Sequence, residues 1–150
     1  MKLFHNAVVL LLAIFTFTVS VHSATFADNT VRITQQETGL YESILAEAYT
    51  NHTSNLQVRG QGMVVKLLPD DNDNNRHQRF IIKLSSGQTL LIAHNVDIAP
   101  RIESLHVGDI VGFYGEYEWN EFGGVLHWTH RDPDGSHISG WLRHAGRIYQ

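Results

Sequence analysis

The sequence predicts a mainly β protein: a small five-stranded barrel with an N-terminal helix and a C-terminal loop or hairpin extension. Strand-like segments separated by turn residues follow one another from Leu56 to the C-terminus. A single stretch with helical spacing precedes them. One long strand-like segment carries Gly112 and Gly115, which suit the bends and bulges of barrel strands. Together these features favour a closed barrel, and an open β-sandwich is the alternative.

The first 23 residues have the features of a secretory signal peptide. Lys2 precedes an apolar run, Ala7–Val19, and Val21 and Ser23 suit the cleavage positions. The run is shorter than the ~20 residues that a membrane-spanning helix needs. We therefore expect cleavage near Ser23, a periplasmic or secreted protein, and no stable membrane insertion afterwards. An uncleaved anchor is the alternative.

The composition restricts the kinds of catalytic and metal site that the protein can form. The chain has no cysteine, which excludes thiol catalysis and zinc–thiolate sites, so a metal site must use His, Asp, Glu, Asn and water. The formal net charge is −4. A broad electrostatic contact with nucleic acid is disfavoured at this charge unless basic residues cluster locally or a cation is bound.

Residues 24–55 form an N-terminal segment, with one amphipathic helix at about 36–50. Leu40, Ile44, Leu45 and Ala48 fall at helical spacing with polar residues between them. The polar stretch NHTSN then ends the segment. Residues 56–150 are expected to form the barrel domain.

The strands follow in order. LQVRGQGMVVKLL is the first, and HQRFIIKL and TLLIAHN form a hairpin around Ser86 and Gly87. DIAPRIESL is a turn or short helical piece, and VGDIVGFYGEYEWN pairs with GGVLHWTH. A final hairpin is placed around Ala145 and Gly146. This order of strand, hairpin, helical break and hairpin resembles an OB-fold.

Several phrases carry a family resemblance: RHQRFIIKL, LLIAHNVDIAPRI, GEYEWNEFGGVLHWTHRDPDG and GWLRHAGRIY. They are similar to an uncharacterised bacterial domain-of-unknown-function family of small exported proteins. The resemblance covers about residues 56–150. It implies bacterial export and the domain boundary, and it implies no mechanism.

Ionisable side chains concentrate in two places. One is the end of the predicted hairpin, and the ligand surface of an OB barrel lies on these strands and the flanking loops; its residues are His77, Arg79, His94, Asn95, Asp97 and Arg101. The other is the following strand pair, VGDIVGFYGEYEWN and GGVLHWTH, where Glu116 and Glu118 share one strand face. His127 and His130 are three apart, so they face opposite sides of an extended strand unless a bulge intervenes. Asp132 begins a turn, DPDG, and turn-capping is its alternative role.

The first hypothesis is an exported, nuclease-like hydrolase of phosphodiesters that uses a divalent metal ion. Arginine binds phosphate, histidine transfers protons, and carboxylates hold the cation. Staphylococcal-type nucleases also carry Arg, Asp and Glu on an OB barrel, which is an analogy. The predicted site comprises catalytic His77, His94, His127 and Glu116, substrate-binding Arg79, Asn95, Arg101 and Trp128, and metal-binding Asp97, Glu118, His130 and Asp132.

Two other functions stay open. The second hypothesis is a non-catalytic module of the cell envelope that binds an oligosaccharide, a nucleic acid or a partner protein. Its stacking surfaces would come from Trp119, Trp128 and Trp141. The third is a histidine-based metal carrier or sensor, although the histidine spacing matches no strong pattern such as HExxH.

Overall fold

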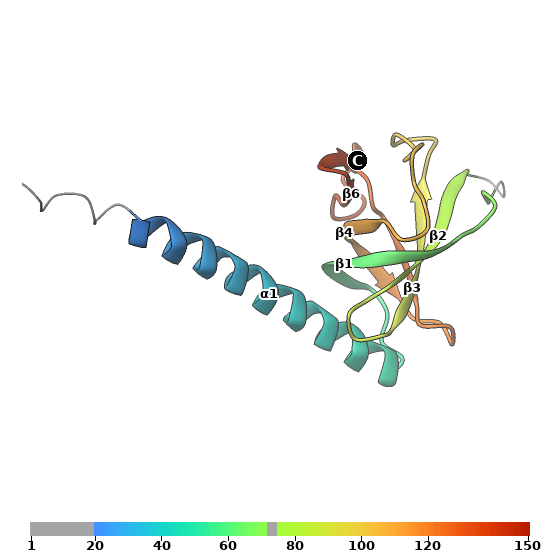
Figure 1. Ribbon diagram of the computed structural model, residues 1–150. Coiled ribbons are helices and arrows are strands. Elements are labelled where there is room, and N and C mark those ends of the chain that lie inside the picture. The colour runs from blue at the N-terminus through green and yellow to red at the C-terminus, as the bar shows by residue number, and fades with distance from the viewer. Residues whose placement is uncertain (1–19, 72–74) are drawn as a thin grey trace, which may run out of the picture. The chain divides into compact units, whose positions relative to one another are not determined.

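A computed structural model describes residues 20–71 and 75–150 of the chain (Figure 1). The predicted signal peptide lies almost entirely outside the described residues and stays a prediction. The chain divides into two compact units at residues 33 and 34, and the unit formed by residues 34–150 contains the whole barrel. Within the described part of the chain, no helix combines the length and the apolar character needed to cross a membrane.

Seven strands form one sheet in the order β1-β2-β3-β5-β4-β6-β7, and β1 also pairs with β4. This extra pairing closes the first five strands into a barrel and rules out the open sandwich. β3 and β5 are parallel and the other neighbours are antiparallel. The predicted OB-like fold is thus confirmed. The strands are β1 Leu56–Leu67, β2 His77–Lys83, β3 Thr89–Asn95, β4 Ile110–Glu118, β5 Val125–His127, β6 Trp141–His144 and β7 Arg147–Tyr149.

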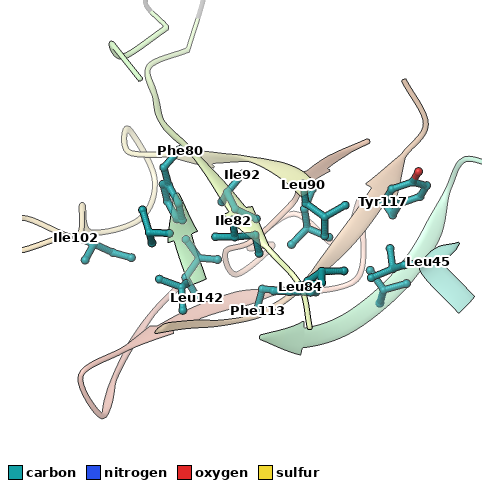
Figure 2. Close-up of a cluster of buried hydrophobic side chains, with 14 of the residues drawn as sticks. Leu45, Phe80, Ile82, Leu84, Leu90, Ile92, Ile102, Phe113, Tyr117 and Leu142 are labelled. Atoms are coloured by element: carbon teal, nitrogen blue, oxygen red, sulfur yellow. The ribbon is translucent and has the colours of Figure 1, made fainter. Parts of the chain in front are cut away.

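The core fills the inside of the barrel, because apolar residues alternate with polar ones along each strand. Phe80 and Ile82 of β2 face Leu90 and Ile92 of β3, and all four are fully buried (Figure 2). Gly60 of β1 gives room to Phe113, whose ring would lie 2.8 Å from a Cβ atom at that position. Burying these apolar side chains is the main stabilisation of the domain.

The helix is longer than predicted. α1 spans Ser20–Thr50, whereas the apolar spacing predicted a helix only from about residue 36. The sequence has no proline or glycine between residues 20 and 38 to stop it, and propensity carries the helix past its amphipathic part. Leu45 and Ala48 near its C-terminal end are buried in the barrel core.

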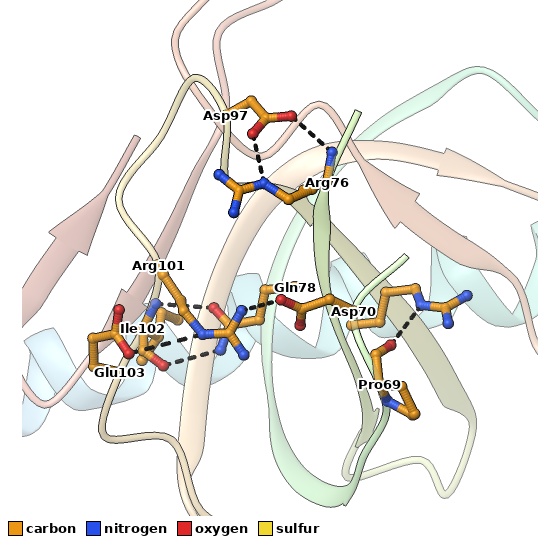
Figure 3. A network of polar contacts seen from close by, with 9 residues as sticks. Pro69, Asp70, Arg76, Gln78, Asp97, Arg101, Ile102 and Glu103 are labelled. Carbon is orange, nitrogen blue, oxygen red and sulfur yellow. Dashed lines mark hydrogen bonds and ion pairs between the residues drawn. The ribbon is translucent and has the colours of Figure 1, made fainter. Parts of the chain in front are cut away.

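The connection between β3 and β4, residues 96–109, consists of turns and no helix, which is one of the two forms predicted for DIAPRIESL. Gln78 of β2 forms side-chain hydrogen bonds with the backbone N–H and carbonyl of Ile102, which would otherwise be free to pair within a helix. Its side-chain amide donates to the carbonyl of Ile102 and accepts from the Ile102 N–H, both at 2.9 Å (Figure 3). Ile102 itself is buried in the core. These contacts hold the connection as an extended cover on the barrel.

Glu42 of α1 ties the helix to the turn between β2 and β3. Its carboxylate accepts hydrogen bonds from the Ser85 N–H at 3.1 Å, the Ser85 hydroxyl at 2.6 Å and the Ser86 N–H at 2.9 Å. The side chain is buried, so water replaces these bonds only when the helix moves away. The contact fixes the C-terminal part of α1 on the barrel.

Glu42→Ala is expected to lower the free energy of unfolding by about 2 kcal/mol, because hydrogen bonds to a charged group each contribute about 1.5–3 kcal/mol. Urea unfolding followed by circular dichroism measures the change. Glu47→Ala is the matched control, since Glu47 is exposed on the same helix and should change stability by less than about 0.5 kcal/mol. Equal effects of both substitutions would contradict the role of Glu42.

Candidate functional site

Three ionisable side chains meet on the outer face of the β4–β5 strand pair. In the antiparallel register Glu116 lies opposite His127 and Glu118 opposite Val125. Tyr117 and Leu126 point into the core and are fully buried, so strand alternation turns Glu116, Glu118 and His127 outward. The Nε2 atom of His127 lies 3.7 Å from Oε1 of Glu116 and 3.9 Å from Oε1 of Glu118. We call these three residues the cation cluster.

The cation cluster has the geometry of a metal site. One potential ligand atom of each residue lies within 4.8 Å of the other two. Nε2 of His127 is buried and has no hydrogen-bond partner among the described residues, although buried polar atoms normally have one. Two carboxylates and one imidazole suit a divalent ion such as Mn²⁺ or Zn²⁺.

The electrostatics of His127 favour metal binding. Burial lowers the pKa of His127, and its effect outweighs the opposite pull of Glu116 and Glu118. The ring is therefore neutral at neutral pH and keeps a lone pair for a ligand bond. A cation between the three groups would also relieve the repulsion between the two carboxylates.

Trp128 directly follows β5 and changes the direction of the chain. Its φ of 51° lies in the left-handed region, which is uncommon for a residue other than glycine. The alternation expected for GGVLHWTH therefore stops at His127. The ring of Trp128 stacks on His137 at 4.1 Å between centroids, and His127 and His130 lie at 5.3 Å and 5.7 Å. Much of the histidine-rich strip is thus packing around one indole.

His130 and Asp132 lie in this packed segment and are not members of the cation cluster. Burial lowers the pKa of His130, whose Nδ1 atom pairs with the carbonyl of Arg131 at 2.7 Å. The carboxylate of Asp132 accepts hydrogen bonds from the backbone N–H groups of Asp134 and His137. These bonds lower the pKa of Asp132 and match the turn-capping alternative.

His94 lies inside the barrel, away from solvent. It follows Leu90 and Ile92 on the inward face of β3, and its exposed fraction is 0%. Nδ1 contacts the Thr129 hydroxyl at 2.9 Å, and Nε2 contacts the Pro100 carbonyl at 3.2 Å. Burial lowers the pKa of His94 to about 4. The geometry gives His94 a role in the core, and it has no surface from which to reach a substrate.

The remaining predicted residues lie on β2, at the end of β3 and in the loops. His77 and Arg79 alternate with the inward residues of β2, and Nε of Arg79 donates to the Pro69 carbonyl at 3.1 Å. The carboxylate of Asp97 accepts from the N–H and Nε of Arg76, and these bonds lower the pKa of Asp97 (Figure 3). The other loop contacts are the ion pair of Arg101 with Asp70 and the bond from the Asp97 N–H to Asn95 Oδ1 at 3.0 Å.

Sequence reasoning missed Gln57. It lies opposite Glu116 in the β1–β4 pairing. Its Nε2 atom is buried, and no hydrogen-bond partner for it lies in the part of the chain that the structure describes. A lone glutamine in a strand carries no signal of its own. Only the closure of the barrel brings it beside Glu116, where its amide adds a further polar group next to the cation cluster.

Comparisons with known proteins give a family and no function. A family model described as "Protein of unknown function (DUF3465)" matches residues 25–150. The match starts near the predicted cleavage site and covers both the helix and the barrel. No curated protein matches the chain.

Proposed function

The chain belongs to the DUF3465 family, and from the geometry of its site we propose that it binds a divalent cation and hydrolyses phosphodiesters, like a nuclease. The observation that carries the proposal is the convergence of Glu116, Glu118 and His127 within 4.8 Å. The unpartnered Nε2 of His127 supports it further. The three side chains are half-buried, and three protein ligands leave further coordination positions of a bound ion for water and substrate.

The bound cation supplies a Lewis acid for the phosphoryl oxygen and lowers the pKa of bound water. Glu116, Glu118 and His127 hold it, and Arg79 can bind the phosphate beside it. Arg79 lies opposite Ala93, and the β3–β5 register, continued by one residue, places Ala93 next to His127. Two strand spacings, about 10 Å, separate Arg79 from His127. The Arg79 guanidinium contacts the Pro69 carbonyl at 3.1 Å and Asp71 at 3.9 Å, so it must leave these partners to reach a phosphate at the cation cluster.

The protein is further proposed to be periplasmic or secreted, with a nucleic acid or another phosphodiester as substrate. The positive Lys2, the apolar run and the small residues near Ser23 support export. Cleavage would take Lys2 away and change the formal net charge from −4 to −5. A cation at the cluster would offset part of this charge when a polyanion approaches.

The test uses tag-free protein that has been freed of metal with a chelator. Calorimetric titration with Mg²⁺, Mn²⁺ and Zn²⁺ measures cation binding. Incubation with single-stranded and double-stranded DNA and RNA as substrates measures cleavage. We expect saturable binding of one ion per chain, and cleavage that returns only when the metal is restored. A folded protein that binds none of these ions would overturn the proposal.

A binding module of the cell envelope is the second candidate, and specific contacts favour it. Arg101 and Arg76 are engaged by Asp70 and Asp97, which leaves fewer cations for a transition state. Trp119 packs against His52, and its indole N–H donates to the Tyr49 carbonyl, so Trp141 is the better stacking surface. Saturable cation binding without cleavage in the same experiment would favour this candidate or a metal carrier.

A further inference from the structure

A pocket lies between α1 and the outer face of β1 and β6. Its volume is about 260 Å³, and Glu37, Tyr41, Arg59, Trp141 and Arg143 are among its lining residues. All of them belong to the barrel unit, residues 34–150. None of them belongs to the cation cluster, so the pocket is a separate feature of the molecule.

The strand register explains how the pocket forms. Strand β4 lies between β1 and β6. Tyr114 of β4 pairs with Arg59 of β1 and with Trp141 of β6. Gly112 of β4 pairs in the same way with Gln61 and Arg143. A Cβ atom at Gly112 would lie 3.4 Å from Nε of Arg143. The Arg143 side chain therefore passes closely over the bare backbone of Gly112.

The pocket combines two guanidinium groups with two aromatic rings. Arg59 lies over the ring of Tyr41 at 5.3 Å and pairs with Glu37 at 3.0 Å. Arg143 lies over the ring of Trp141 at 5.8 Å, and no carboxylate among the described residues pairs with it. Two arginines and one glutamate leave a local charge of +1 on a protein with a net charge of −4.

We propose that this pocket binds a small organic anion that carries one planar ring. Guanidinium groups form bidentate hydrogen bonds with carboxylate or phosphate, and aromatic side chains pack against planar groups. The volume of about 260 Å³ lies just below the ~300–1,000 Å³ typical of sites for drug-sized ligands. A single-ring anion therefore fits this pocket better than a polymer does.

Phenyl phosphate, benzoate and inorganic phosphate are the probes, added to the full chain and followed by calorimetry and by Trp fluorescence. We expect saturable binding of phenyl phosphate or benzoate at millimolar or lower concentrations, and at least tenfold weaker binding of inorganic phosphate, which lacks the ring. The Arg143→Gln substitution should weaken the binding of the ring-bearing anion at least tenfold. The comparison of benzoate with phenyl phosphate decides between carboxylate and phosphate.

Arg147→Gln is the matched control. Arg147 also lies over an aromatic ring, that of Tyr149 at 5.0 Å, but it does not line the pocket. This variant should bind the probes as the unmodified protein does, and Glu118→Gln should too, because the cation cluster lies elsewhere. Binding that is equal in Arg143→Gln and the unmodified chain, or no saturation with either ring-bearing anion, would overturn the proposal.

Discussion

Replacing His127 with alanine is expected to abolish the stabilisation of the folded protein by divalent cations. A ligand present at 100 times its Kd raises the free energy of unfolding by about 2.7 kcal/mol. The unmodified chain should gain this amount from Mn²⁺ or Zn²⁺, and His127→Ala should gain little, because one of three ligands is gone. Urea unfolding with and without the cation measures the difference.

Further variants of the cation cluster distinguish a metal site from a group of residues that only stabilises the fold. Without cation, Glu116→Gln should leave stability unchanged or raise it, because it removes one of two neighbouring carboxylates. Glu103→Gln and His106→Ala are matched controls, since both side chains are strongly exposed, at 83% and 78%. If His127→Ala keeps the full gain in stability, the three residues do not hold the ion.

If the protein cleaves phosphodiesters, His127→Ala should also lower the cleavage rate by at least about 100-fold. A bound metal contributes several kcal/mol to the transition state, and each factor of ten corresponds to about 1.4 kcal/mol. The controls should cleave at the unmodified rate. Retained cleavage in a variant that no longer binds the cation would place the chemistry elsewhere.

The titration of His94 alone is expected to cost the folded protein about 3 kcal/mol of stability between pH 6.5 and pH 4. Burial holds the pKa of His94 at about 4, below its usual 6.5. In this interval the unfolded chain binds a proton at His94 and the folded chain does not, so stability rises with pH and falls on acidification. The span of about 2.5 pH units, at about 1.4 kcal/mol per unit, gives the magnitude.

The His94→Gln substitution tests whether His94 causes this loss of stability, because glutamine can form hydrogen bonds with Thr129 and Pro100 but does not titrate. The variant should be less stable at pH 7 and should show a flatter dependence of unfolding free energy on pH. Burial also lowers the pKa of His127 and His130, so part of the slope will remain. His106→Gln, at an exposed position, should keep the full slope. An unchanged slope in His94→Gln would contradict the assignment.

The sequence by itself determined the strands and which residues share a strand face. Period-two alternation paired Glu116 with Glu118 on one face. The same alternation groups His94 with Leu90 and Ile92, so the inward position of His94 was present in the sequence before the structure showed it. Turn residues such as Gly87 and Gly146 correctly marked two of the three predicted hairpins. These features depend on neighbours along the chain, and local patterns report them directly.

Only the tertiary structure decided which of these residues meet. The closure of β1 on β4 brings Gln57 beside Glu116, and the pairing of β5 with β4 places His127 against both glutamates. The left-handed conformation of Trp128 turned the rest of the histidine strip into packing. Local periodicity specifies a face but not a partner, because pairing between distant strands depends on closing the whole barrel.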